Sequence, residues 1–172
     1  MERITKTGLK GIELIKKFES FRSKPYICPA GVPTIGYGST YYPDGKRVTM
    51  LDKSISEEEA SNMLIKLLEF YEKEVDSLTR DDINQNQFDA LVSFAFNVGT
   101  GNLKSSTLLK KVNVNPKDIL IKNEFMKWVY GGDGTSNGID DDGDGLIDEK
   151  GERKKLPGLV SRRTEEANLF FS

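Results

Sequence analysis

The sequence contains no histidine and a single cysteine, and these two absences exclude several kinds of functional site. Without histidine, the chain cannot form a histidine-activated nucleophile, and it cannot bind a metal through imidazole. The lone cysteine, Cys28, has no second cysteine with which to form a disulfide inside one molecule. We therefore expect side-chain packing to stabilise the fold.

Long apolar runs are absent as well. No segment approaches the roughly 20 apolar residues that a membrane-spanning helix requires. The first 19 residues are interrupted by charges every few positions and do not resemble a secretion signal. We expect one domain over residues 1–172, with no membrane partner, that acts as a monomer.

Charge is distributed unevenly along the chain. The net charge is −2, but residues 132–152 hold eight acidic residues and one lysine. The remainder has 24 basic and 19 acidic residues, a net charge of +5. A mildly basic surface favours an anionic polymer as partner, although it also serves solubility alone. No stripe of basic and aromatic residues accompanies it, so we expect no nucleic-acid partner.

Apolar residues recur at helical spacing in several segments. Residues 84–98 are apolar on most sides, which indicates a helix at the centre of the core. Ser56 and Glu59 form a capping-box signature, and Asn115 before Pro116 is typical of a helix start. The expected helices cover residues 7–18, 57–79, 84–98, 105–112, 116–130 and 159–171, and short strands are expected within 33–50.

Three chemically useful side chains lie close together in the sequence. Glu19, Cys28 and Thr34 occur in a span predicted to contain a helix end, a turn and the start of a strand. Such a span can fold back and direct all three side chains into one cleft. A glutamate, a thiol and a hydroxyl suit acid-assisted cleavage by water, in which one group protonates the leaving oxygen and the others hold the water.

The same span carries a family resemblance. Thr34 opens the motif Thr-Ile-Gly-Tyr-Gly, and its spacing from Glu19 and Cys28 is similar to that of the phage-type lysozymes, the muramidases of glycoside hydrolase family 24. The chain departs from the family pattern at Ser20, where glycine is usual, and at Ser39, where histidine is common. Residues 84–99, 128–130 and 156–170 resemble further family segments, so the resemblance covers most of the chain apart from residues 133–155.

The resemblance implies an α+β, lysozyme-like fold. A small strand-bearing lobe (about residues 20–58) and a larger all-helical lobe (about 59–172) would enclose a cleft. Glu19 would be the general acid, Cys28 would polarise the attacking water or stabilise charge on the sugar, and Thr34 would hold the water. The residues expected to bind substrate are Tyr26, Asn97 and Arg163. For Arg162 and Arg163, the alternative is an ion pair with Glu19 or Glu166.

The implied activity is that of an endolysin. Such an enzyme hydrolyses the β-1,4 bond from N-acetylmuramic acid to N-acetylglucosamine in bacterial peptidoglycan and needs no cofactor for catalysis. It would wait in the host cytoplasm until a holin-type pore releases it to the wall. Two alternatives stay open: a lytic transglycosylase, which uses one acid and no activated water, and an inactive calcium-dependent module that binds the wall.

The acidic segment, about residues 132–155, has the spacing of a calcium loop. Aspartates stand at positions 1, 3, 5 and 9 of the loop, with glycine at position 6. The usual glutamate at position 12 is replaced by Gly151, and a solvated acidic loop is the alternative. The predicted structural calcium ligands are Asp140, Asp142, Asp144, the carbonyl of Leu146 and Asp148.

Overall fold

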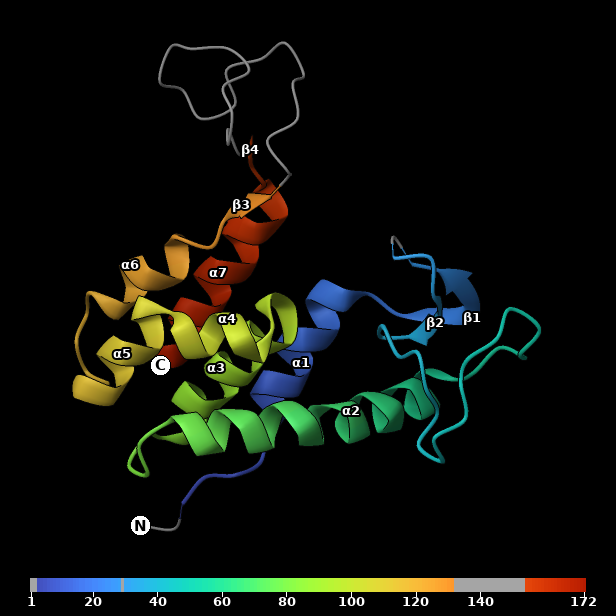
Figure 1. The fold of residues 1–172 in the computed structure, drawn as a ribbon, viewed down its shortest axis with the longest axis horizontal. Coiled ribbons are helices and arrows are strands. Elements are labelled where there is room, and N and C mark those ends of the chain that lie inside the picture. The colour runs from blue at the N-terminus through green and yellow to red at the C-terminus, as the bar shows by residue number, and fades with distance from the viewer. Residues whose placement is uncertain (1–2, 29, 132–153) are drawn as a thin grey trace.

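The structure is a computed structural model that describes residues 3–28, 30–131 and 154–172. In these ranges helices dominate and two short antiparallel sheets accompany them (Figure 1), which confirms the predicted α+β class. None of the described helices is long and apolar enough to cross a bilayer. The helices are α1 (Leu9–Glu19), α2 (Glu57–Leu78), α3 (Gln85–Val98), α4 (Thr100–Ser105), α5 (Thr107–Val114), α6 (Ile121–Met126) and α7 (Pro157–Phe170). The strands are β1 (Arg22–Ile27), β2 (Pro33–Gly36), β3 (Tyr130–Gly131) and β4 (Lys154–Lys155).

Helix α3 occupies the centre of the helical part, as its apolar sequence predicts. Fully buried side chains project from most of its sides, among them Phe88, Leu91 and Phe94. Burying one such side chain contributes about 1.5–3 kcal/mol relative to leaving it exposed. Because α3 packs against α1, α2 and α7, it holds these three helices in fixed relative positions.

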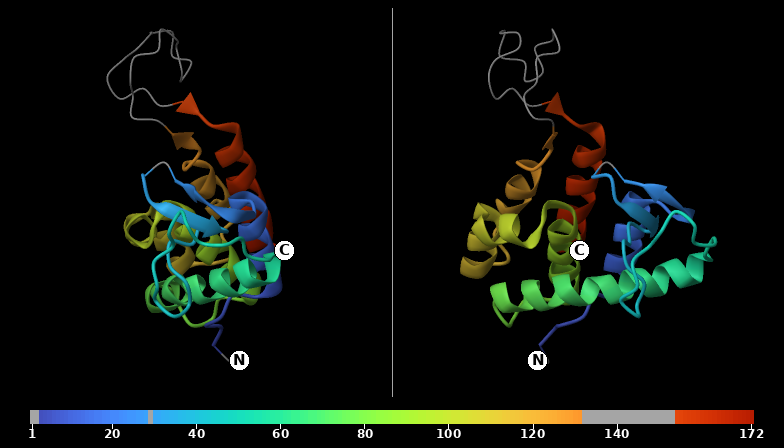
Figure 2. Two further views of the ribbon diagram at one scale, coloured as in Figure 1. Left: turned by 90° about the vertical axis from the view of Figure 1, so that its right-hand side faces the viewer. Right: turned by 45° about the vertical axis from the view of Figure 1, so that its right-hand side comes forward.

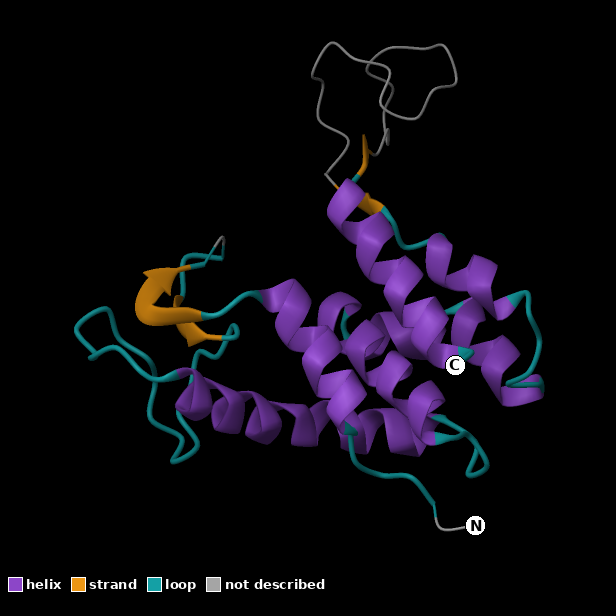
Figure 3. Cartoon of the chain, turned by 180° about the vertical axis from the view of Figure 1, so that it is seen from behind, coloured by secondary structure: helices purple, strands orange, loops and turns teal. Residues whose placement is uncertain are grey.

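The sheet of β1 and β2 lies at one end of the molecule, and α2 connects it to the other helices (Figures 2 and 3). We call residues 20–56, which include both strands and the loops after them, the small lobe. The strand register pairs Tyr26 with Thr34. At the start of α2, Ser56 and Glu59 exchange side-chain and main-chain hydrogen bonds, which confirms the predicted capping box.

The prediction of a helix over residues 116–130 is wrong. The side chains of Asn115 and Asp118 each accept a hydrogen bond from an amide two residues further on, so this segment forms turns. Helix α6 begins only at Ile121. The prediction also lacked α4, which starts directly after Gly99, a residue with a φ of 92° that ends α3 and redirects the chain.

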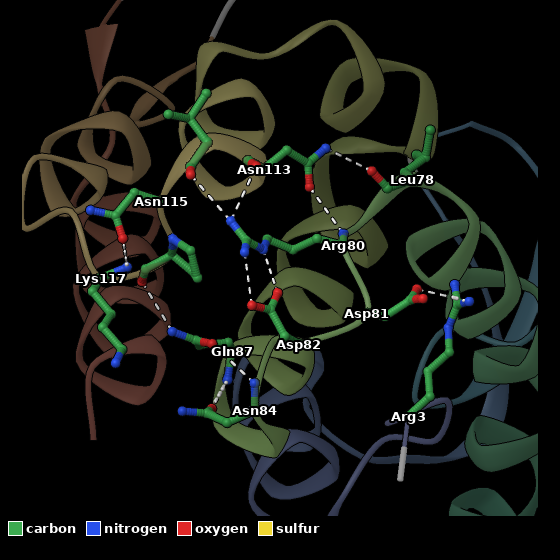
Figure 4. A network of polar contacts seen from close by, with 12 residues as sticks. Arg3, Leu78, Arg80, Asp81, Asp82, Asn84, Gln87, Asn113, Asn115 and Lys117 are labelled. Carbon is green, nitrogen blue, oxygen red and sulfur yellow. Dashed lines mark hydrogen bonds and ion pairs between the residues drawn. The ribbon is translucent and has the colours of Figure 1, made fainter. Parts of the chain in front are cut away.

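The connection between α2 and α3 is fastened to the end of α5 (Figure 4). Arg80 Nη1 donates hydrogen bonds to the main-chain oxygens of Asn113 at 3.3 Å and Val114 at 3.1 Å. Its Nη2 donates to Asp82 at 2.8 Å, and the Asn113 amide donates to the Leu78 carbonyl at 2.9 Å. Carbonyls at a helix end have no partner inside the helix, so these contacts satisfy carbonyls at the ends of α2 and α5.

Candidate active site

Glu19 is the last residue of α1, where the chain leaves the helix towards β1. Its Oε1 accepts a hydrogen bond from Nη1 of Arg162 on α7 at 2.6 Å, across 143 residues of sequence. Arg162 is only 4% exposed, whereas 24% of the Glu19 side chain remains accessible. The carboxylate is therefore held by a buried guanidinium and still reachable from solvent.

A buried polar cluster behind Arg162 joins α7 to α3. Glu166 is fully buried and accepts hydrogen bonds from Nε of Arg162 at 3.2 Å and from the Ser93 hydroxyl at 2.7 Å. Nε of Arg163 lies 2.9 Å from the second Glu166 oxygen. Burial raises the pKa of Glu166, and the two guanidiniums and the hydroxyl oppose that rise. Burial lowers the pKa of Arg163 to about 10, which leaves it charged at neutral pH.

Asn97 and Arg163 meet, but only one of them is accessible. Nη2 of Arg163 donates a hydrogen bond to Oδ1 of Asn97 at 2.8 Å. Asn97 is exposed near the end of α3, whereas Arg163 has no exposed surface and also lies over the ring of Phe94. In this arrangement Asn97 is free to contact a ligand, and Arg163 orients it from behind.

Cys28 and Thr34 come together at the turn between β1 and β2. The Cys28 amide donates to the Val32 carbonyl at 3.1 Å, and the Thr34 hydroxyl donates to the same carbonyl at 2.9 Å. Hydrogen bonding by the Val32 main chain, and then by Thr34, lowers the pKa of the Cys28 thiol. The turn therefore favours the thiolate, which is the form that polarises water.

A cavity of about 410 Å³ separates the small lobe from the helical part and is partly lined by Glu19. Ser39 and Tyr41 line it from the small lobe, and Tyr71 and Phe96 line it from α2 and α3. Cys28 and Thr34 are not among its lining residues. The structure thus brings Cys28 and Thr34 together at the hairpin turn, whereas Glu19 is the one of the three predicted residues that lines the cavity.

Ser39 is a buried residue of this cavity with an unused hydroxyl. Its main chain exchanges two hydrogen bonds with Ile35, of 2.9 and 3.0 Å, which fix the turn after β2. The side chain is buried, and its Oγ has no hydrogen-bond partner among the described residues. The sequence departs from the resembling family at this position, so the hydroxyl stands where a larger ring is common.

Tyr26, predicted to bind substrate, has a different neighbour. The guanidinium of Arg22 lies 4.6 Å from the centre of its ring. Both residues belong to β1, four positions apart, and the pairing of β1 with β2 is irregular between them. Tyr26 is therefore placed on the small-lobe surface with a cation stacked on it.

Sequence reasoning missed the aromatic wall of the cavity. The rings of Tyr71 and Phe96 lie 5.1 Å apart and face the cavity that Glu19 lines. Phe96 occurs in the segment 84–98 that was assigned to the core, Tyr71 occurs in the predicted helix over 57–79, and both are only partly buried. In the sequence, each is an aromatic residue at the edge of the apolar face of a helix. That position does not distinguish a residue that lines a cavity from one that packs in the core.

The predicted calcium ligands lie outside the described residues. Within the described ranges, no group of three or more acidic, histidine or cysteine side chains is arranged to hold a metal ion. The prediction for residues 140–148 therefore stays a prediction.

Comparison with known proteins places this geometry in context. The family model described as "Phage lysozyme" matches residues 16–166. The endolysin of Bacillus phage B103 is 39% identical over 167 residues, which is 94% of this chain and 52% of that protein, so the chain spans about half its length. The solved endolysin from Escherichia coli O157:H7 phage FAHEc1 has a TM-score of 0.79 at 28% identity and covers 100% of this chain and 97% of its own. The muramidase domain of SpmX from Asticaccaulis excentricus has a TM-score of 0.74 at 31% identity, over 97% and 98% of the two chains.

Proposed function

Because this chain belongs to the phage lysozyme family, we propose that it is an endolysin, a monomer that hydrolyses the β-1,4 bond from N-acetylmuramic acid to N-acetylglucosamine in peptidoglycan. The position of Glu19 carries the proposal. Its carboxylate lines the cavity beside the small lobe, and a buried arginine holds it there. A general acid needs such a fixed and accessible position beside the oxygen that it protonates.

In the proposed reaction, Glu19 gives its proton to the glycosidic oxygen as the bond from that oxygen to the muramic acid C1 breaks. A water held by Cys28 and Thr34 forms the new bond to C1, and the thiolate takes a proton from that water. The lowered pKa of Cys28 supports this role, because a larger fraction of the thiol is ionised. The products are a free hydroxyl on N-acetylglucosamine and a reducing muramic acid end.

Asn97 and Tyr26 are the proposed substrate contacts. Asn97 is exposed at the end of α3, and its neighbour along the chain, Phe96, lines the cavity. Tyr26 pairs with Thr34 across the small sheet, which puts it one strand away from the proposed water site. The role of Arg163 is to orient Asn97, because a fully buried side chain does not contact a glycan.

The test is mass spectrometry of the fragments that the protein releases from purified peptidoglycan. Hydrated, reducing muramic acid ends are expected for hydrolysis, whereas 1,6-anhydro ends would indicate a lytic transglycosylase. Glu19→Gln should abolish release and keep the fold. Glu13→Gln, on an exposed glutamate of the same helix, is the matched control and should stay active. Binding without any fragments would favour a wall-binding module.

We also propose that the protein reaches the wall through a holin-type pore. Residues 9–19 form α1, which packs against the core helix α3 and ends in the proposed catalytic acid, so they belong to the folded domain. Expression in a bacterial host should therefore cause lysis only when a pore-forming holin is present. Lysis by the protein alone would contradict this route.

A structural calcium ion in the acidic insertion is a further proposal, and it rests on the sequence. Five aspartates lie within the nine residues 140–148 and repel one another, and a divalent cation bound by four of them relieves that repulsion. The proposed ion has no part in the cleavage step, because Glu19, Cys28 and Thr34 supply the acid and the water site.

A further inference from the structure

The small lobe carries positive charge that the fold does not use. Its five cations are exposed, and none forms an ion pair with a described residue. Its two acidic residues are Asp44, which accepts a hydrogen bond from a main-chain amide, and Asp52, which accepts three from Thr49 and Tyr42. The cations are Arg22, Lys24, Lys46, Arg47 and Lys53.

Arg47 is the member of this set whose side chain stacks on a residue that lines the cavity. Its guanidinium carbon is 5.4 Å from the centre of the Tyr41 ring, and the two residues also form an antiparallel bridge. Tyr41 is 48% exposed and lines the cavity that Glu19 lines. Arg47 does not itself line the cavity, and its contact with Tyr41 puts it at the outer edge of the lining, on the small-lobe side.

The guanidinium of Arg47 is oriented but has no hydrogen-bond or ion-pair partner in the part of the chain that the structure describes. Stacking on an aromatic face restricts the side chain and leaves the N–H groups at its edge free. Arg47 donates no side-chain hydrogen bond to any residue in the described ranges, in contrast to Arg80 and Arg162. A planar group with free donors is suited to an oxyanion, which it can bind through two parallel hydrogen bonds.

The other small-lobe cations add positive charge to the same lobe. Arg22 stacks on Tyr26 in the same manner, at 4.6 Å. The Ile55 amide donates to the Ser23 carbonyl at 2.9 Å, which brings the segment after Lys53 beside β1. Exposed charges act over about 8 Å at physiological salt, so Lys46, which directly precedes Arg47 in the chain, reinforces the attraction there.

We propose that Arg47, supported by Tyr41, binds an anionic group of the cell-wall polymer at the rim of the Glu19 cavity. The inference rests on the proposed function and names a specificity contact for it. The ligand chemistry is an oxyanion, supplied by a carboxylate of the wall's peptide side chains or by a phosphodiester of polymers attached to the wall. Arg22, Lys24, Lys46 and Lys53 attract the same polymer without a defined contact.

The experiment compares Arg47→Gln and Arg47→Lys with wild type on purified walls. Loss of one charge-assisted contact at an exposed site should raise KM about three- to tenfold and leave kcat unchanged. Arg47→Lys should recover part of the loss, because it keeps the charge without the planar fork. Lys122→Gln, on an exposed cation of α6, is the matched control and should behave as wild type.

Two treated walls identify the anion. One has its phosphodiester polymers removed, and the other has its carboxyl groups converted to amides. The Arg47→Gln effect should vanish on the wall that has lost the group Arg47 binds, and a persistent effect on both would overturn the proposal. Equal KM values for Arg47→Gln and wild type on untreated walls would also overturn it, while reducing muramic acid ends would still support the proposed function. Cosedimentation of wild type and Arg47→Gln with walls tests the contact without cleavage, and equal binding there counts against it.

Discussion

At the scale of single residues, Cys28 connects local geometry to pH dependence. Hydrogen bonding by the Val32 main chain and by Thr34 lowers the pKa of the thiol, so the thiolate is present above the lowered value and is lost as pH falls through it. Muramidase activity on purified peptidoglycan should decline on the acid side with that titration. Cys28→Asp should stay active and move the acid limb to lower pH, because a carboxylate ionises near pH 3.9. A fully active Cys28→Ala would remove the thiol from the mechanism.

Ser39 supports a prediction about stability, in which removal of a side-chain group does not destabilise the fold. A buried hydroxyl without a partner costs about 1–3 kcal/mol of desolvation, and Ser39 has no partner among the described residues. Ser39→Ala should therefore leave the thermal midpoint unchanged or raise it. Ser106→Ala is the contrast, because the Ser106 hydroxyl caps α5 at the Leu109 amide and its loss should cost about 1 kcal/mol. Equal destabilisation by both changes would show that the Ser39 hydroxyl has a partner.

At the scale of elements, the contact between the small lobe and α2 depends on Gly36. Its φ is 67°, and a Cβ added there would lie 3.0 Å from the Cβ of Ala60. Gly31 has a similar φ of 76° but open space around it. Gly31→Ala should cost about 1 kcal/mol through backbone strain alone, and Gly36→Ala should cost more by denaturant unfolding. Equal costs would mean that α2 and the turn separate easily.

The same elements show how far sequence reasoning reaches. The capping box at Ser56 and the all-round apolar pattern of α3 were predictable because both signals are local and agree with the packing. Asn115-Pro116 misled because an asparagine side chain satisfies a turn as well as a helix start. Helix α4 was missed because Gly99 both ends α3 and precedes α4. A glycine at this place predicts the end of a helix but does not predict that another helix follows.

At the scale of the whole molecule, the candidate site is made by segments that are far apart in the chain. The pairing of Glu19 with Arg162 spans 143 residues, and no local pattern predicts it. The order of Glu19, Cys28 and Thr34 was readable because all three fall within one hairpin and its preceding helix. Arg162, Tyr71 and Phe96 surround the same acid only because α1, α2 and α7 all pack on α3.

The acidic insertion couples to this architecture through its two ends. Tyr130 of β3 pairs with Lys155 of β4, directly before the helix that carries Arg162, so an ion that orders the insertion would stabilise the whole domain. Calcium at 100 times its dissociation constant should add about 2.7 kcal/mol, which for a chain of this size raises the thermal midpoint by roughly 5–10 °C. Chelation should reverse the shift, and replacing Asp142 and Asp144 with asparagine should prevent it. Identical melting curves with calcium and with chelator would contradict the calcium site and indicate a solvated acidic segment. Wall cleavage should proceed in either condition, because the proposed ion has no role in bond breaking.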